Sequence, residues 1–331
     1  MAKTAVIAGA SGFIGRSLTA DFASHGYTVK RIGRGEPHAR WGDSDSIRRV
    51  LEGADAVVNL AGKSVNCRYT DRNRAEVLRS RTDTTRELRE AIAACETPPR
   101  VWINASTATI YRHAMDRPMT ETAGEYGTGF SVDVARNWER EFFAGELPET
   151  RRVALRIAIV LGDGPATAML LALARLGLGG AQHDGWWFPH RRYRGIGPDP
   201  SGDGSAPMHH TRGRQRFSWV HIDDVLGAIR HVIAHPELDG PVNVASPNPS
   251  DNRSLMATLR KVVRQPIGLP AFRWMLEPAM WLLRTEPELV LKSRWVLPER
   301  LSASGYVFRW PELEPALRDV AASRGQDRAE A

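Results

Sequence analysis

The sequence of 331 residues contains little cysteine and no long hydrophobic run. Its two cysteines, Cys67 and Cys95, lie in neither a CxxC pair nor a metal-ligand spacing, so no disulfide framework or metal site is predicted and both thiols are expected to be free in a reducing compartment. The most apolar later stretch, Phe272 to Leu283, is too short and too interrupted by charge and proline to span a bilayer. The N-terminus shows no signal-peptide pattern. A cytoplasmic protein without a membrane partner is expected.

Lysine is also scarce. The chain has 45 Lys plus Arg against 38 Asp plus Glu, but only five of the basic residues are lysines, namely Lys3, Lys30, Lys63, Lys261 and Lys292. The basic excess is spread along the chain and does not form a tail, which argues against a nucleic-acid partner. The length suggests about two domains, or one domain with a substantial appendage.

A glycine-rich motif lies at the start of the chain, where Thr4 to Gly15 reads TAVIAGASGFIG. A short β-favouring run enters three glycines at GxxGxxG spacing, and a helical pattern begins at once. This context distinguishes the motif from a simple glycine-rich turn. It predicts a dinucleotide-phosphate site, because the glycines allow a tight turn, close approach of a pyrophosphate and close helix packing. The predicted cofactor contacts in the motif are Gly9, Ser11, Gly12, Phe13, Ile14 and Gly15.

The next β-like run, Thr28 to Ile32, is followed by Gly33-Arg34-Gly35. An NAD site places an acidic residue at this point against the ribose hydroxyls, whereas a guanidinium pairs with the 2′-phosphate of NADP. Arg34 therefore predicts NADP (NADPH) as the cofactor. The alternative for Arg34 is an ordinary solvated loop arginine.

The GxxGxxG spacing resembles the short-chain dehydrogenase/reductase superfamily, particularly its extended, epimerase-like branch. The run Asp55 to Gly62, DAVVNLAG, is similar to an element that passes the adenosine side in that branch, which implies that Ala61 and Gly62 contact the cofactor. The apolar strand at Arg156 to Gly162 leads into a turn that passes the nicotinamide in this superfamily. The resemblance therefore makes Gly162 a further candidate for cofactor binding.

A hydroxyl-bearing segment follows the next predicted strand, Val101 to Asn104, and the resemblance implies that Thr107 hydrogen-bonds the substrate oxygen. In these dehydrogenases a YxxxK pair follows about twenty residues later, in which the lysine lowers the pKa of the tyrosine for proton exchange. Phe130 and Val134 occupy those positions, and no lysine lies nearby. The standard acid/base pair is therefore absent.

Two residues are left as possible proton donors. Tyr111 ends the hydroxyl-bearing segment, and His221 is expected near the carboxyl edge of the sheet with a pKa range that suits proton transfer. A structural histidine with satisfied hydrogen bonds is the alternative for His221. Asp223, which follows it, is expected to cap a helix.

Several further segments resemble the YfcH-like epimerase-family proteins, an atypical subgroup of the superfamily that lacks the tyrosine/lysine pair. They include FSVDVARNWE at Phe130 to Glu139, LRIAIVLG at Leu155 to Gly162, FSWVHIDDV at Phe217 to Val225, GPVNVASPNP at Gly240 to Pro249, and VLPERLSASGYVFRWPEL near the end. The resemblance implies an NADP-binding fold with a small C-terminal domain of its own. It does not define the reaction.

A segment from Gly179 to Arg216 replaces the short Gly-rich link usual in this subgroup. Its aromatic residues argue against disorder, so it is predicted to be a lid over the active site or a protomer contact. Its histidines raise the alternative of a metal site, which is not favoured because acidic or cysteine partners at ligand spacing are missing. Its basic and aromatic residues raise a second alternative, a site for single-stranded nucleic acid. An anionic small substrate fits the same residues equally well.

Together these features predict an α/β protein with a Rossmann-like doubly wound parallel sheet (1–178 and 217–247). A smaller, mostly helical, discontinuous second domain is expected from the insertion or lid (179–216) and the C-terminal helices (248–318), followed by a flexible tail (319–331). The favoured function is an NADP-dependent oxidoreductase or epimerase-like enzyme acting on a small carbonyl or hydroxyl substrate. The alternative is a non-catalytic NADP-binding regulatory or sensor protein. The chain is expected to be a monomer or a homodimer.

Overall fold

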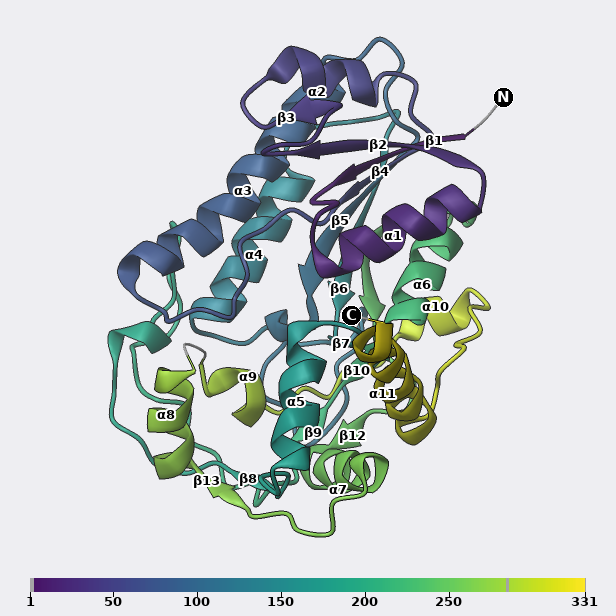
Figure 1. Cartoon of the computed structure of the whole chain (residues 1–331). Coiled ribbons are helices and arrows are strands. Elements are labelled where there is room, and N and C mark those ends of the chain that lie inside the picture. Colours follow the sequence, from purple (N-terminus) through teal and green to yellow (C-terminus); the bar gives the residue numbers. More distant parts are fainter. Residues whose placement is uncertain (1–2, 284–285, 331) are drawn as a thin grey trace.

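The computed structural model describes residues 3–283 and 286–330, and a seven-stranded parallel sheet lies at its centre (Figure 1). The strand order is β11-β6-β5-β4-β1-β2-β3, so the chain winds outward from β1 in both directions. The strands are β1 (Lys3–Ala8), β2 (Tyr27–Gly33), β3 (Ala39–Arg40), β4 (Ala56–Asn59), β5 (Val101–Thr107), β6 (Arg151–Ile157) and β11 (Gly240–Val244). This confirms the predicted doubly wound, Rossmann-like fold.

Helices cover both faces of the sheet (Figure 1). Side chains alternate along β1: Ala5 and Ile7 belong to the core beneath α1 (Phe13–Ser24) and α6 (Ile222–Ala234), whereas Val6 and Ala8 belong to the core on the other face. That second face is covered by α2 (Ser44–Leu51), α3 (Asp71–Ala93) and α4 (Phe130–Phe143). Since both faces are buried, the central strands are mostly apolar, as is usual for parallel strands.

A second, mainly helical part lies beyond the carboxyl edge of the sheet, in the lower half of Figure 1. It contains α5 (Pro165–Arg175), α7 (Asn252–Val263), α8 (Arg273–Leu282), α9 (Glu288–Leu291) and α11 (Leu313–Glu330), whereas α10 (Glu299–Ala303) packs beside β11 in the sheet domain. Three short pairs connect it: β7 (Ile159–Leu161) with β10 (Trp219–His221), β8 (Gln182–His183) with β13 (Ala271–Phe272), and β9 (Arg216–Phe217) with β12 (Ser250–Asp251). Helices α5, α7 and α11 share one apolar core.

The segment 179–216 is folded against the rest of the protein. Arg74 of α3 donates hydrogen bonds to the backbone carbonyls of Arg191 and Arg194, at 2.8 and 2.6 Å. The carboxylate of Asp133 in α4 accepts the backbone N–H of Ser201 at 2.6 Å. These contacts bring the segment over the carboxyl edge of the sheet, although it contains little regular secondary structure.

Residues 319–330, which the sequence predicts as part of a flexible tail, form the last two thirds of α11, and Val320 is buried in the core shared with α5 and α7. Ala331 lies outside the described residues. Within the ranges 3–283 and 286–330, no helix is both long enough and apolar enough to cross a membrane.

Candidate functional site

The glycine-rich motif forms a tight cradle between β1 and α1. Gly9 has a φ of +81°, and a Cβ there would lie 2.8 Å from the backbone of Leu60. A Cβ on Gly15 would lie 2.3 Å from the carbonyl oxygen of Gly9, so only glycine lets α1 approach the strand this closely. Gly12 lies between them, and its N–H donates to the Gly9 carbonyl at 3.1 Å.

The N-terminus of α1 is open to an anion. Gly12 is the N-cap residue, no side chain among the described residues caps the helix, and its first turn contains no acidic residue. Ser11 is exposed beside it, and the first-turn residues Phe13 and Ile14 are partly exposed. Unsatisfied backbone N–H groups and the positive end of the helix dipole favour a phosphate at such a terminus. These features fit the pyrophosphate of a dinucleotide.

Arg34 lies at the same edge of the sheet. The N–H of Gly9 donates to the carbonyl of Ile32 at 3.2 Å, so the end of β2 borders the cradle directly. Two residues further on, Arg34 is exposed, and it forms neither a hydrogen bond nor an ion pair with the residues that the structure describes. Its guanidinium is therefore available to a ligand in the cradle.

The other predicted cofactor contacts surround the cradle. Ala61 is buried, and its N–H donates to the Asn59 side chain at 3.0 Å. Gly62 follows on the exposed side of this turn. Gly162 approaches the start of α1 from the other side: a Cβ there would lie 2.6 Å from the ring of Phe13. The structure thus brings these three residues, from two parts of the chain, to one end of α1.

Thr107 is the last residue of β5 and is partly exposed at the carboxyl edge. Its Oγ1 accepts the N–H of Thr109 at 3.2 Å, which starts a short 3₁₀ turn over Ala108–Ile110. Among the described residues the Thr107 hydroxyl donates no hydrogen bond, and its role toward a substrate oxygen stays a prediction.

Tyr111 has a different environment from the one that a proton donor needs. It is 2% exposed, and its hydroxyl donates to Asn243 Oδ1 at 2.9 Å and accepts from Arg156 Nη1 at 2.9 Å. Arg156 in turn forms an ion pair of 2.7 Å with Glu139. Burial raises the pKa of the Tyr111 phenol. The hydroxyl therefore belongs to a buried polar network in the core.

His221 is the N-cap residue of α6. Its Nδ1 accepts the N–H of Asp223 at 3.2 Å, its Nε2 lies 3.3 Å from the Asp319 carboxylate of α11, and only 2% of it is exposed. Burial lowers its pKa. The ring thus fixes the start of α6 against α11. The prediction that Asp223 caps α6 is wrong, because His221 does so, and Asp223 instead accepts the indole N–H of Trp310 at 3.0 Å.

A pocket of about 440 Å³ opens beyond the end of β5. Its walls come from several parts of the chain, among them residues 126–130 before and at the start of α4, residues 202–207 of the insertion, and Leu291 and Lys292 at the end of α9. Phe130, which stands where a catalytic tyrosine would be expected, presents its ring here and packs edge-on against Tyr69 at 4.5 Å. The pocket is therefore the natural place for a substrate.

Lys292 is one of several charged residues that line this pocket. Its Nζ donates to the carbonyl of Thr109 at 2.8 Å, two residues beyond Thr107, and within the described part of the chain it has no other hydrogen-bond or ion-pair partner. Burial lowers its pKa from the ordinary 10.5 to about 8, with Glu288 opposing the shift. No local motif surrounds this lysine in the sequence, so the sequence does not mark it as a site residue.

Two histidines complete the same wall. The rings of His113 and His209 stack with their centroids 3.4 Å apart, and Nδ1 of His113 accepts the N–H of Ser293 at 3.1 Å. Burial lowers the pKa of His113 to about 3 and that of His209 in the same direction, so both rings are neutral near pH 7. Across residues 3–283 and 286–330, no group of three or more His, Cys, Asp or Glu is arranged to hold a metal ion.

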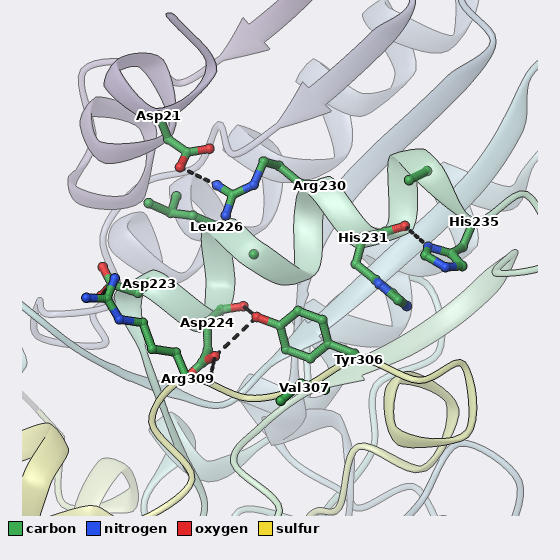
Figure 2. Close-up of a pocket in the computed structure, with 12 residues that line it drawn as sticks. Asp21, Asp223, Asp224, Leu226, Arg230, His231, His235, Tyr306, Val307 and Arg309 are labelled. Carbon is green, nitrogen blue, oxygen red and sulfur yellow. Dashed lines mark hydrogen bonds and ion pairs between the residues drawn. The ribbon is translucent and has the colours of Figure 1, made fainter. Parts of the chain in front are cut away.

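A second hollow, of about 500 Å³, lies along the outer side of α6 (Figure 2). Its polar groups pair with one another: Arg230 forms an ion pair with Asp21 of α1, and the Tyr306 hydroxyl donates to Asp224 at 3.1 Å. The Asp224 carboxylate also accepts the backbone N–H of Arg309 at 2.7 Å. This hollow is where the C-terminal segment is attached to the sheet domain, and it contains none of the predicted site residues.

The parallel sheet and the open glycine cradle define a Rossmann-type protein of the NAD(P)-binding class. Residues 5–130 match the sequence model described as "NAD dependent epimerase/dehydratase family". Residues 271–320 match a "Domain of unknown function (DUF1731)", which includes α8, Lys292 and the start of α11. The two matches confirm the predicted resemblance to epimerase-family proteins that have a small C-terminal domain of their own.

Known relatives are similar along nearly the whole chain. Epimerase family protein YfhF of Bacillus subtilis (strain 168) is 27% identical over 325 residues, covering 96% of this chain and 97% of that protein. Epimerase family protein SDR39U1 of Mus musculus is 29% identical over 324 residues, with coverages of 96% and 99%. The crystal structure of human epimerase family protein SDR39U1 (isoform 2) with NADPH matches with a TM-score of 0.80 at 26% identity, covering 96% of this chain and 99% of that one.

Proposed function

We propose that the protein is an NADP(H)-dependent oxidoreductase or epimerase-like enzyme that acts on a small carbonyl or hydroxyl compound in the pocket beyond β5. The observation that carries this proposal is the position of Lys292. A lysine ammonium lines a pocket of about 440 Å³ and is held by the carbonyl of Thr109, immediately after the strand that ends in Thr107. Perturbed titratable groups in a pocket at the carboxyl edge of such a sheet are typical of active sites.

The choice of NADP(H) rests on the cradle and on Arg34. The uncapped start of α1 suits the pyrophosphate, and the unpaired guanidinium of Arg34, outside β2, suits the 2′-phosphate. The human relative SDR39U1 was crystallised with NADPH, which supports the same assignment here. Bound in this orientation, the nicotinamide would supply or accept a hydride at the substrate carbon.

Proton transfer is assigned to Lys292 in place of the absent tyrosine. In the direction of reduction, the ammonium donates a proton to the substrate oxygen as the C=O bond becomes a C–OH bond, and the resulting amine takes a proton back from water. A pKa of about 8 lets the amine hold or release a proton near neutral pH. Thr107 orients the same oxygen through its hydroxyl proton.

The cofactor assignment is tested by titrating the protein with NADPH and with NADH and following the nicotinamide fluorescence. Arg34→Asp should weaken NADPH by at least tenfold and leave NADH within about threefold, because one charge-assisted phosphate contact is lost. Arg100→Asp is the matched control: Arg100 is also exposed but precedes β5, at the opposite edge of the sheet. An equal response of the two cofactors to Arg34→Asp would remove the basis for NADP.

Turnover decides between the enzyme and the non-catalytic alternative. NADPH oxidation is followed with a panel of aldehydes, ketones and quinones, for the natural chain and for Lys292→Met. We expect turnover that falls at least 100-fold in Lys292→Met with unchanged NADPH affinity. Tight NADPH binding without turnover across the panel would favour a regulatory or sensor protein, a function that the missing tyrosine/lysine pair also permits.

A further inference from the structure

An apolar face lies on the helical part of the protein, where the end of α5, the loop before β13 and helix α8 carry exposed apolar residues. It consists of Leu178, Ile267, Leu269, Trp274, Trp281 and Leu282, which are all exposed. Trp274 is 67% exposed, Trp281 57% and Leu282 73%. Single exposed apolar residues are common on proteins, but several large ones on adjoining elements mark an interaction site.

Backbone hydrogen bonds join two of the segments that carry these residues. The N–H of Leu269 donates to the carbonyl of Gly177 at 2.8 Å, and the N–H of Gly180 donates to the carbonyl of Leu269 at 3.1 Å. The end of α5 and the loop before β13 therefore lie side by side. β13 continues directly into α8, which carries Trp274 and Trp281. The face is thus built on hydrogen-bonded backbone and a helix.

The charges around the face have one sign. Residues 171–181 and 262–283, all of them described, contain a single acidic residue, Glu277. Glu277 is 3% exposed and forms an ion pair of 3.2 Å with Arg273. Arg175 and Arg264 are exposed at the margin. The face therefore presents tryptophan and leucine within a basic border and no acidic side chain to solvent.

We propose that the apolar face docks on the surface of an anionic lipid bilayer. Tryptophan and leucine enter the boundary between headgroups and acyl chains, while arginines at the border meet lipid phosphates and anionic headgroups. A second copy of the chain fits less well, because two such faces in contact would bring their basic borders together without an acidic counterpart. The sequence-based expectation of no membrane partner concerned spanning segments, which a surface contact does not need.

The test is co-sedimentation of the full chain with phosphatidylcholine vesicles and with vesicles containing 30% phosphatidylglycerol, at ~50 and ~300 mM salt. We expect binding to the anionic vesicles only, weaker at the higher salt. The double variant Trp274→Ser/Leu282→Ser should reduce binding at least tenfold. Arg175→Gln/Arg264→Gln should reduce both binding and its salt dependence. Val307→Ser is the control, since Val307 is 85% exposed beside α6, and it should bind as the natural chain does.

Folding of each variant is checked by its circular dichroism spectrum and by NADPH affinity. Equal binding to neutral and anionic vesicles, or no binding to either, would refute the proposal. So would a stable dimer in light scattering that Trp274→Ser/Leu282→Ser dissociates, because the face would then be covered by a second copy. The test uses no turnover, so it stands apart from the proposed enzymatic function.

Discussion

Replacing Lys292 by methionine should stabilise the protein at neutral pH while it removes the proposed proton donor. Burial lowers the pKa of this ammonium from 10.5 to about 8. At 1.36 kcal/mol for each pH unit, keeping the charge in the folded protein costs about 3 kcal/mol. The variant also loses the hydrogen bond to Thr109, which contributes about 1 kcal/mol. The net expectation for Lys292→Met at pH 7 is a gain of about 2 kcal/mol.

The free energy of unfolding should depend on pH in a direction that follows from the lowered pKa of Lys292. The folded pKa of Lys292 is lower than the unfolded one, so between about pH 8 and pH 10.5 the unfolded chain binds more protons than the folded chain. The stability of the natural protein therefore rises with pH in this window, and the advantage of Lys292→Met shrinks. The other groups around the ammonium are the same in the natural protein and the variant. They are the charged side chains of Glu288 and Arg294 and the neutral rings of His113 and His209.

Urea unfolding at pH 7.0 and pH 9.5 measures the effect. Lys261→Met is the matched control, because Lys261 is exposed on α7 and pairs with Glu314 at the surface, and it should change stability by less than about 1 kcal/mol at both pH values. The reasoning is refuted if Lys292→Met is no more stable than the natural protein at pH 7, or if its advantage is the same at pH 9.5.

Two further substitutions test the cradle and the buried Tyr111 network independently. Gly15→Ala should weaken NADPH at least tenfold, since the new Cβ would meet the Gly9 carbonyl at 2.3 Å, whereas Gly35→Ala enters open space and should bind normally in the same titration. Unchanged binding by Gly15→Ala would contradict the close packing of α1. Tyr111→Phe leaves the Asn243 side chain without a buried donor and should cost about 1–3 kcal/mol in urea unfolding while turnover persists; loss of turnover at retained stability would instead make Tyr111 catalytic.

Much of the sheet domain could be predicted because its signals are local. The apolar run at Asp55 to Gly62 indicates a strand that is buried on both faces, and β4 is buried throughout. The glycine spacing identifies the cradle, and Gly9 and Gly15 are held by contacts that exclude a side chain. The absence of a tyrosine/lysine pair can also be predicted from the sequence. In the structure, Phe130, which has no hydroxyl, lines the pocket.

The proposed proton donor, Lys292, could not be predicted from the sequence, because its position depends on contacts between distant segments. The 3₁₀ turn after Thr107 directs the Tyr111 side chain into the core. There the side chain of Asn243, 132 residues away, accepts a hydrogen bond from the Tyr111 hydroxyl. No feature near Tyr111 in the sequence indicates this partner. Lys292 likewise lies in a segment without a motif, and only the folded C-terminal part brings it to the pocket.

The hydrogen bond between Lys292 and Thr109 joins residues 183 positions apart. During synthesis, the glycine cradle between β1 and α1 leaves the ribosome well before Lys292 does. A truncated chain that ends before Ala271 would therefore keep the glycine motif but lack the proposed proton donor. Nucleotide binding and the proposed proton transfer thus depend on parts of the chain that are synthesised at different times.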